Sequence, residues 1–141
     1  IKTSGNPDAH LILRGGKQPN YQAEFVAEAE VAIEKAGYNP AIIVDCSHAN
    51  SNKDYSRQPA VAKDILVQLE QGNRSIVGIM LESHINEGNQ KLSPNLADMK
   101  YGVSVTDACI NWQSTEELVV EFAQRLKSVV AKKSEQVTEP A

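Results

Sequence analysis

The chain has 141 residues, of which 41% are hydrophobic and 23% are charged, a composition typical of an ordinary globular domain rather than a disordered protein. Its 18 acidic residues outnumber its 14 lysines and arginines, and the net charge of -4 argues against binding to nucleic acid or to an anionic membrane. The sequence holds no apolar run near the roughly 20 residues of a membrane span and no signal-peptide pattern, so we expect a cytoplasmic protein.

Three apolar runs, at residues 10–13, 41–44 and 75–81, have the composition and flanking residues of buried strands. Each is followed by a segment with helical periodicity, at residues 21–36, 59–70 and 115–130. Asn20 and Ser114 stand where N-caps of the first and third helices are expected, and Gly37 where the first helix should end. This alternation predicts an α/β fold with a parallel sheet and right-handed crossovers.

Arg14, His48 and Glu82 end the three apolar runs at a constant spacing of 34 residues. Tetratricopeptide repeats share this period, but they are purely helical and would not contain the strand-like runs. We therefore interpret the period as that of a βα unit. Three such units leave both edges of an apolar sheet exposed, so we expect a part of a larger fold, with a flexible tail at 131–141.

These three residues also form a candidate functional site, because the carboxyl ends of parallel strands meet at one edge of a sheet. The guanidinium of Arg14 suits a phosphate or carboxylate, and the side chains of His48 and Glu82 suit a divalent metal. The long connection at 83–105 can fold over this edge and present Asp107 as another carboxylate ligand. The four residues together predict a site for a metal and a phosphorylated substrate.

The alternation of side chains along a strand predicts which residues share a face with each candidate. His48 should lie in phase with Cys46 and Val44, and Glu82 with Met80. We expect Cys46 and Met80 to fill a barrel interior. Both Cys46 and Cys109 are expected to be reduced thiols, because two cysteines make neither a disulfide framework nor a zinc knuckle.

Each candidate also has a purely structural interpretation. His48 could be a hydrogen-bonded histidine, Arg14 could lead a turn, and Glu82 could be an exposed strand end. Asp107 follows Ser104 and Thr106 and could serve as a capping or turn residue. The remaining histidines, His10 and His84, are out of phase or at the wrong strand end and are expected to be structural.

Four segments resemble motifs of the type I 3-deoxy-D-arabino-heptulosonate 7-phosphate (DAHP) synthases of bacteria and fungi, with the greatest similarity to the tyrosine-sensitive members. They are LILRGG at 11–16, DCSHANSNK at 45–53, ESHINEGNQ at 82–90 and YGVSVTDACI at 101–110. The resemblance implies that residues 1–130 are the C-terminal three βα units, strands 6 to 8, of a TIM (β/α)8 barrel. It also implies that the chain is the C-terminal part of such an enzyme.

The resemblance implies a role for each candidate residue. His48, Glu82 and Asp107 match three of four metal ligands, which makes His48 a catalytic residue, and Arg14 matches an arginine that binds the phosphate of phosphoenolpyruvate. The fourth family ligand is a cysteine further upstream, which neither Cys46 nor Cys109 matches. The implied metal is one divalent ion of Mn, Fe, Co or Zn.

The implied reaction joins phosphoenolpyruvate to D-erythrose 4-phosphate and water, giving DAHP and phosphate as the first step of the shikimate pathway and of aromatic amino acid biosynthesis. Feedback inhibition by an aromatic amino acid, here tyrosine, is implied as well. Because the upstream ligand and substrate-binding residues are absent, we expect this chain alone to be inactive and to bind metal weakly or not at all. It should cover its open strand edges by forming a homo-oligomer.

Two alternatives differ in function. The related 3-deoxy-octulosonate 8-phosphate synthases share the barrel and the phosphoenolpyruvate chemistry, but their motif around the metal histidine differs from the one at 45–50. The chain could also be a non-catalytic module for assembly or ligand sensing. An activity assay of the chain, with and without an added N-terminal piece, separates these possibilities.

Overall fold

Three parallel strands form a sheet in the order β1-β2-β3 in the computed structural model, which describes residues 1–6, 8–127 and 129. They are β1 (Leu11–Leu13), β2 (Ile42–Asp45) and β3 (Ile76–Met80), each within one residue of a predicted apolar run. Leu13 pairs with Val44, and Asp45 pairs with Met80. The predicted α/β fold with a parallel sheet is confirmed for this part of the chain.

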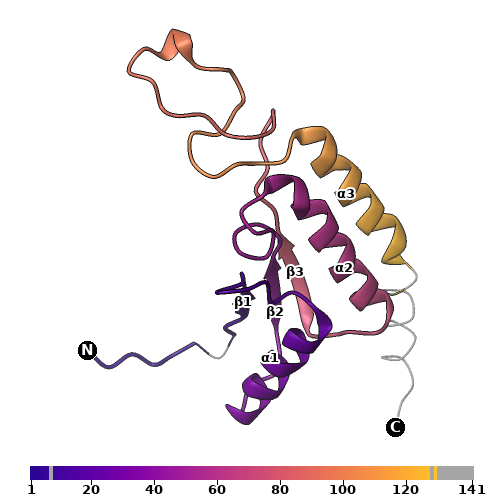
Figure 1. The fold of residues 1–141 in the computed structure, drawn as a ribbon. Coiled ribbons are helices and arrows are strands. Elements are labelled where there is room, and N and C mark those ends of the chain that lie inside the picture. Colours follow the sequence, from indigo (N-terminus) through magenta and orange to yellow (C-terminus); the bar gives the residue numbers. More distant parts are fainter. Residues whose placement is uncertain (7, 128, 130–141) are drawn as a thin grey trace.

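Three helices alternate with the strands (Figure 1): α1 (Ala23–Lys35), α2 (Gln58–Glu70) and α3 (Trp112–Arg125). Gly37 follows the C-cap Ala36 of helix α1, as predicted, and its φ of 83° lets Tyr38 N donate to Ile33 O at 3.2 Å. A short 3-10 turn, η1 (Tyr55–Arg57), leads into α2. The predicted tail at 131–141 and the last predicted helical residue lie outside the described residues.

Two predicted helix starts are wrong. Helix α1 has Gln22 as its N-cap, because the side chain of Asn20 instead accepts a hydrogen bond from Gly15 N at 2.7 Å. Helix α3 begins at Trp112, because Asn111 Oδ1 accepts from Ser114 N at 2.8 Å and so caps the helix one turn earlier than expected.

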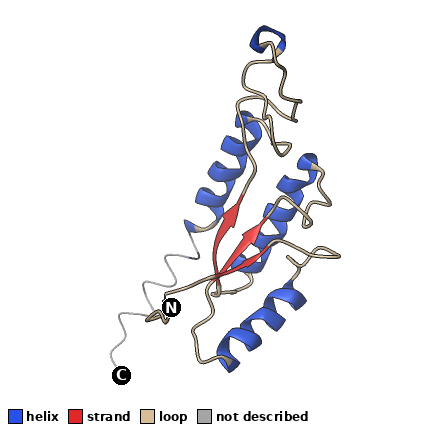
Figure 2. Cartoon of the chain, turned by 90° about the vertical axis from the view of Figure 1, so that its left-hand side faces the viewer, coloured by secondary structure: helices blue, strands red, loops and turns tan. Residues whose placement is uncertain are grey.

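The helices cover one face of the sheet (Figure 2). Two buried clusters fill the space between the layers. The first cluster joins the strands to α1 and α2, and its buried members are Leu13, Val26, Ile42, Val44, Ile65 and Ile76. The second cluster joins the end of β2 to α2 and α3, and its buried members are Cys46, Val61, Ala62, Ile110 and Leu118. On the opposite face, Ile12 is 51% exposed. Apolar side chains therefore remain open to solvent on the face that carries no helix.

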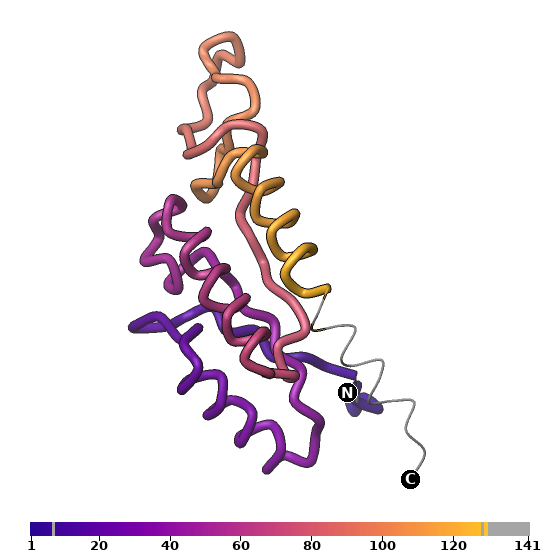
Figure 3. Tube along the Cα trace, turned by 90° about the vertical axis from the view of Figure 1, so that its right-hand side faces the viewer, coloured from indigo at the N-terminus to yellow at the C-terminus, as the bar shows by residue number. Residues whose placement is uncertain are grey.

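A long connection, which we call the arm (residues 83–111), extends away from the sheet and returns to its edge (Figure 3). It contains a 3-10 turn, η2 (Leu96–Asp98). Gln90 fastens its two sides together, since its amide donates to Lys100 O at 2.8 Å and accepts from Lys100 N at 2.9 Å. The arm is thus ordered by its own hydrogen bonds. In the part of the chain that the structure describes, no helix is both long and apolar enough to cross a membrane.

Candidate metal centre

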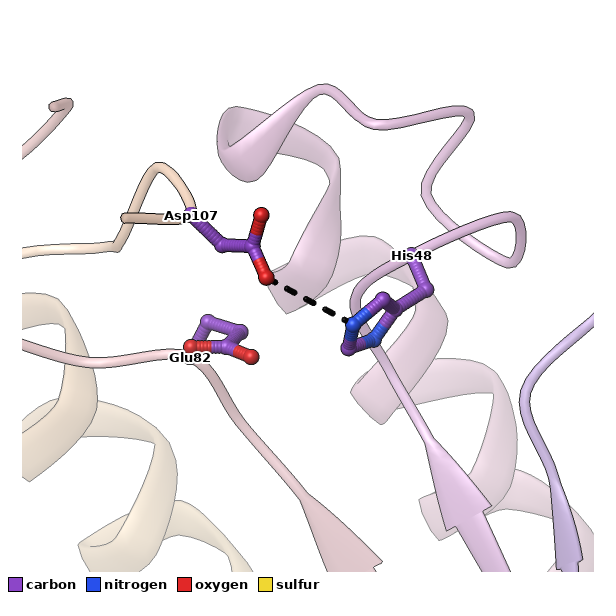
Figure 4. Close-up of side chains that lie close together, drawn as sticks. All are labelled: His48, Glu82 and Asp107. Carbon is purple, nitrogen blue, oxygen red and sulfur yellow. Dashed lines mark ion pairs between the residues drawn. The ribbon is translucent and has the colours of Figure 1, made fainter.

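His48, Glu82 and Asp107 converge beyond the carboxyl ends of β2 and β3 (Figure 4). One potential ligand atom from each residue lies within 4.8 Å of the others, and His48 Nε2 is 3.7 Å from Asp107 Oδ2. An imidazole nitrogen and two carboxylates in this arrangement are a donor set that suits a divalent cation. The structure therefore brings together the three residues that the sequence predicted as ligands.

His48 reaches the site by a route that the sequence did not predict. Val44 and Cys46 are both fully buried and pack toward the helices, so they do not share a face with the candidate ligands. After β2 the chain turns, with Lys53 N donating to His48 O at 2.8 Å, and His48 adopts a left-handed φ of 48°. The turn, rather than strand alternation, aims the imidazole at the site. The expectation that Cys46 fills a barrel interior is wrong, since it lies between the sheet and α2.

Asp45, the last residue of β2, is a member of the site that sequence reasoning missed. It is 2% exposed, and its Oδ2 lies 2.7 Å from His48 Nδ1. Its other oxygen, Oδ1, accepts from Ser47 N at 2.8 Å. The Nδ1 atom is buried, and the short contact is not aligned as a hydrogen bond. The sequence did contain a signal for Asp45, because it is an acidic residue that ends an apolar run three positions before a candidate ligand.

Glu82 is held through its backbone. The amide of Gln58, at the start of α2, accepts from Glu82 N at 2.8 Å and donates to Glu82 O at 3.2 Å. Gln58 is completely buried. Because both ends of one rigid amide bind the same residue, the position of Glu82 beyond β3 is fixed by α2.

Asp107 arrives on the returning side of the arm. Ile110 N donates to Glu82 O at 2.9 Å and His84 N donates to Ile110 O at 3.0 Å, which forms a parallel bridge between the two sides. This bridge lies three residues after Asp107 and holds it near Glu82. The carboxylate of Asp107 is 69% exposed, so it faces solvent as a ligand in an open site would.

A small cavity of about 130 Å³ opens beside the triad, lined by Ser47, His48, Lys53, Asp107 and Ala108. Arg14 is exposed just after β1 and is not among the residues that line this cavity. The turn that follows Arg14 nevertheless reaches the turn that carries His48, because a Cβ placed on Gly15 would lie 2.6 Å from Ala49 Cβ.

Among the described residues, the two other histidines do not belong to the group formed by His48, Glu82 and Asp107. His84 is exposed, and its Nδ1 accepts from Ile85 N at 2.9 Å. His10 borders a larger, mainly apolar cavity of about 440 Å³ at the opposite end of β1, together with Tyr38 and residues of α1. The larger cavity offers no convergent group of metal donors among its lining residues, so its size does not make it the better candidate.

Both thiols are free and buried. Burial raises the pKa of the Cys46 thiol to about 12, and the nearby charge of Asp45 adds to this effect. Burial likewise raises the pKa of Cys109. Neither side chain belongs to the group formed by His48, Glu82 and Asp107. The thiols thus behave as small apolar groups, as expected.

Comparison with known proteins gives a consistent result. A model of the DAHP synthetase I family matches residues 2–121. The chain is 60% identical over 131 residues to the Tyr-sensitive phospho-2-dehydro-3-deoxyheptonate aldolase of Enterobacter agglomerans, covering 93% of this chain and 62% of that protein. It is 57% identical over 126 residues to the Tyr-sensitive protein of Escherichia coli (strain K12), covering 89% of this chain and 35% of that protein.

Identity to the Phe-sensitive protein of Escherichia coli (strain K12) is lower, at 45% over 128 residues, covering 91% of this chain and 36% of that protein. The structure of the phospho-2-dehydro-3-deoxyheptonate aldolase from Francisella tularensis SCHU S4 aligns with a TM-score of 0.81 at 38% identity. That alignment covers 89% of this chain and 36% of the Francisella chain. The chain thus spans about a third of the length of the Escherichia coli and Francisella proteins.

Proposed function

Because the chain belongs to the DAHP synthetase I family, we propose that it is the metal-binding part of an enzyme that condenses phosphoenolpyruvate with D-erythrose 4-phosphate and water to give DAHP and phosphate. The observation that carries the proposal is the convergence of His48, Glu82 and Asp107 within 4.8 Å. The names of the relatives support the reaction. Identity of 48–60% to relatives named Tyr-sensitive or tyrosine-inhibited, against 45% to a Phe-sensitive one, supports tyrosine as the inhibitor of the whole enzyme.

The three strands are proposed as strands 6 to 8 of a TIM (β/α)8 barrel formed by residues 1–130. The parallel order, the helices on one face and the open apolar face all suit a barrel segment, whose inner face is covered only when the remaining strands are present. The TM-score of 0.81 to the Francisella tularensis protein supports the same assignment.

In this proposal, His48 Nε2 and the carboxylates of Glu82 and Asp107 hold one divalent metal ion, of Mn, Fe, Co or Zn. The bound ion would supply Lewis acidity and orientation to the aldehyde of erythrose 4-phosphate. Arg14 would bind the phosphate of phosphoenolpyruvate, since its planar guanidinium pairs with two oxygens at once. We propose His48 as the catalytic residue of the set, since it would hold the metal at the reacting centre.

We further propose that the 141-residue chain alone is inactive and self-associates. Two carboxylates and one imidazole lack the thiolate that the family resemblance implies, and the open face exposes Ile12 and neighbouring apolar side chains. Sedimentation equilibrium should therefore give a mass above the 15.4 kDa of one chain. A monomeric mass at micromolar concentration would contradict this part of the proposal.

The enzymatic proposal is tested by complementation. The chain is assayed for DAHP formation alone and after mixing with the N-terminal part of the Escherichia coli Tyr-sensitive relative, with the His48→Ala variant as a control. We expect no product from the chain alone, product from the mixture, and none from the mixture with the variant. Product from the chain alone would overturn its inactivity, and an inactive mixture whose two parts associate would count against the proposed reaction.

A further inference from the structure

We propose that Asp45 is a positioning residue that holds His48 in the tautomer with hydrogen on Nδ1, leaving the Nε2 lone pair directed at the cation site. The inference rests on the proposed role of His48 as a ligand. It starts from the 2.7 Å distance between Asp45 Oδ2 and His48 Nδ1, on the side of the ring away from Asp107.

The burial of both atoms makes this contact significant. Asp45 is 2% exposed, and a buried carboxylate is costly unless its oxygens have partners. Oδ1 already accepts from Ser47 N, which leaves Oδ2 facing His48. Within the described residues Nδ1 is buried and has no aligned hydrogen-bond partner. At 2.7 Å the two atoms are close enough for one hydrogen bond to satisfy both once the N–H points at Oδ2.

This bond would select one ring nitrogen for the cation. A histidine that donates one N–H to a carboxylate presents the other nitrogen as a bare acceptor, and such carboxylates also fix the ring plane of metal ligands. Nε2 is the nitrogen on the side of Asp107, at 3.7 Å from Oδ2. Asp45, at the end of β2, would therefore set both the orientation of the His48 ring and which of its two nitrogens is free to bind the cation.

Asp54 provides a matched control. Like Asp45, it accepts a hydrogen bond from the backbone two residues later, here from Ser56 N at 3.0 Å. Unlike Asp45, it is exposed, and its carboxylate accepts hydrogen bonds from the backbone and the hydroxyl of Ser56. The substitutions Asp45→Asn and Asp54→Asn therefore remove the same charge from the same kind of turn.

The experiment records long-range 1H–15N correlations of the histidine rings in the metal-free 141-residue chain at pH 8.5, where imidazoles are generally neutral. We expect His48 to carry its hydrogen on Nδ1. Asp45→Asn should shift it to Nε2, because the introduced amide can donate to Nδ1, whereas Asp54→Asn should leave it unchanged. A wild-type His48 protonated on Nε2 would overturn the inference, and this result does not depend on how well a variant folds.

Calorimetric titration with Mn²⁺ gives a second readout. Loss of such a carboxylate weakens metal affinity by about 10–100-fold in comparable sites, so Asp45→Asn should bind Mn²⁺ at least tenfold more weakly than Asp54→Asn. Equal affinities would overturn the inference. If His48 shows the expected tautomers while no variant binds Mn²⁺ even in the complemented mixture with the N-terminal part of the relative, the positioning role stands and the proposed metal function fails, so the two claims are separable.

Discussion

Gln58 and Glu82 are joined by two hydrogen bonds, in which the Gln58 side-chain amide accepts from Glu82 N at 2.8 Å and donates to Glu82 O at 3.2 Å. Glu82 O has a second donor in Ile110 N, at 2.9 Å. Glu82 N is therefore the group that depends on Gln58. This arrangement couples the first turn of α2 to a proposed metal ligand.

Replacement of Gln58 by Ala should lower the free energy of unfolding by about 1–3 kcal/mol, because it removes a fully buried side chain and leaves the part-buried N–H of Glu82 without its acceptor. Urea denaturation followed by circular dichroism measures the change. Gln113→Ala is the control, since Gln113 is an exposed residue near the start of α3 whose side-chain amide donates to the carboxylate of Glu117. This control should change stability by less than about 0.5 kcal/mol. Equal effects of the two substitutions would refute the role of Gln58.

Gly15 should not tolerate a side chain. Its φ is 76°, and an added Cβ would lie 2.6 Å from Ala49 Cβ and 3.0 Å from the Asn50 backbone. Gly15→Ala should therefore destabilise the chain by at least about 1 kcal/mol and shift the amide resonances of the turn that carries His48. Gly16→Ala is the control, because a Cβ there meets nothing within 4 Å, and no loss of stability is expected. Equal melting temperatures would disprove the close approach of the two turns.

Cys46 should react very slowly with thiol reagents in the folded chain. Its pKa is raised to about 12 from 9.0 by burial, so the reactive thiolate is rare at pH 8. Ellman's reagent on the Cys109→Ala variant isolates Cys46, and the same reaction in guanidinium gives the unprotected rate. Because the folded pKa lies above the unfolded one, the associated stability is present below pH 9 and declines between pH 9 and 12. Labelling at the denatured rate would contradict the burial of this thiol.

The strands, and the residues that converge as candidate ligands, could be predicted from sequence because the patterns are local. Apolar runs next to Gly and Pro define β1, β2 and β3 to within one residue, and the 34-residue spacing identifies His48 and Glu82 as equivalent positions. Local patterns did not decide whether Asp107 is a ligand or a capping residue. The resemblance to the family motifs favoured the role of a ligand. The parallel order follows from the alternation of strands and helices.

The features that could not be predicted lie where the chain leaves a strand or enters a helix. Strand alternation placed His48 beside Cys46, but β2 ends at Asp45 and the turn that follows has its own geometry. Asn20 and Ser114 looked like N-caps, but tertiary contacts of Asn20 and the competing cap Asn111 decided the helix starts. The contact of Asp45 with His48 likewise requires the turn to be known.

The convergence of His48, Glu82 and Asp107 is tested most directly by paramagnetic relaxation, which detects even weak binding. Mn²⁺ is added at substoichiometric amounts to the 15N-labelled chain, and amide broadening is mapped along the sequence. We predict that broadening centres on residues 46–50, 81–84 and 106–109 and disappears in the Glu82→Gln variant. Broadening that instead follows exposed acidic residues such as Glu24 and Glu28 of α1, and persists in that variant, would contradict a metal centre at this edge of the sheet.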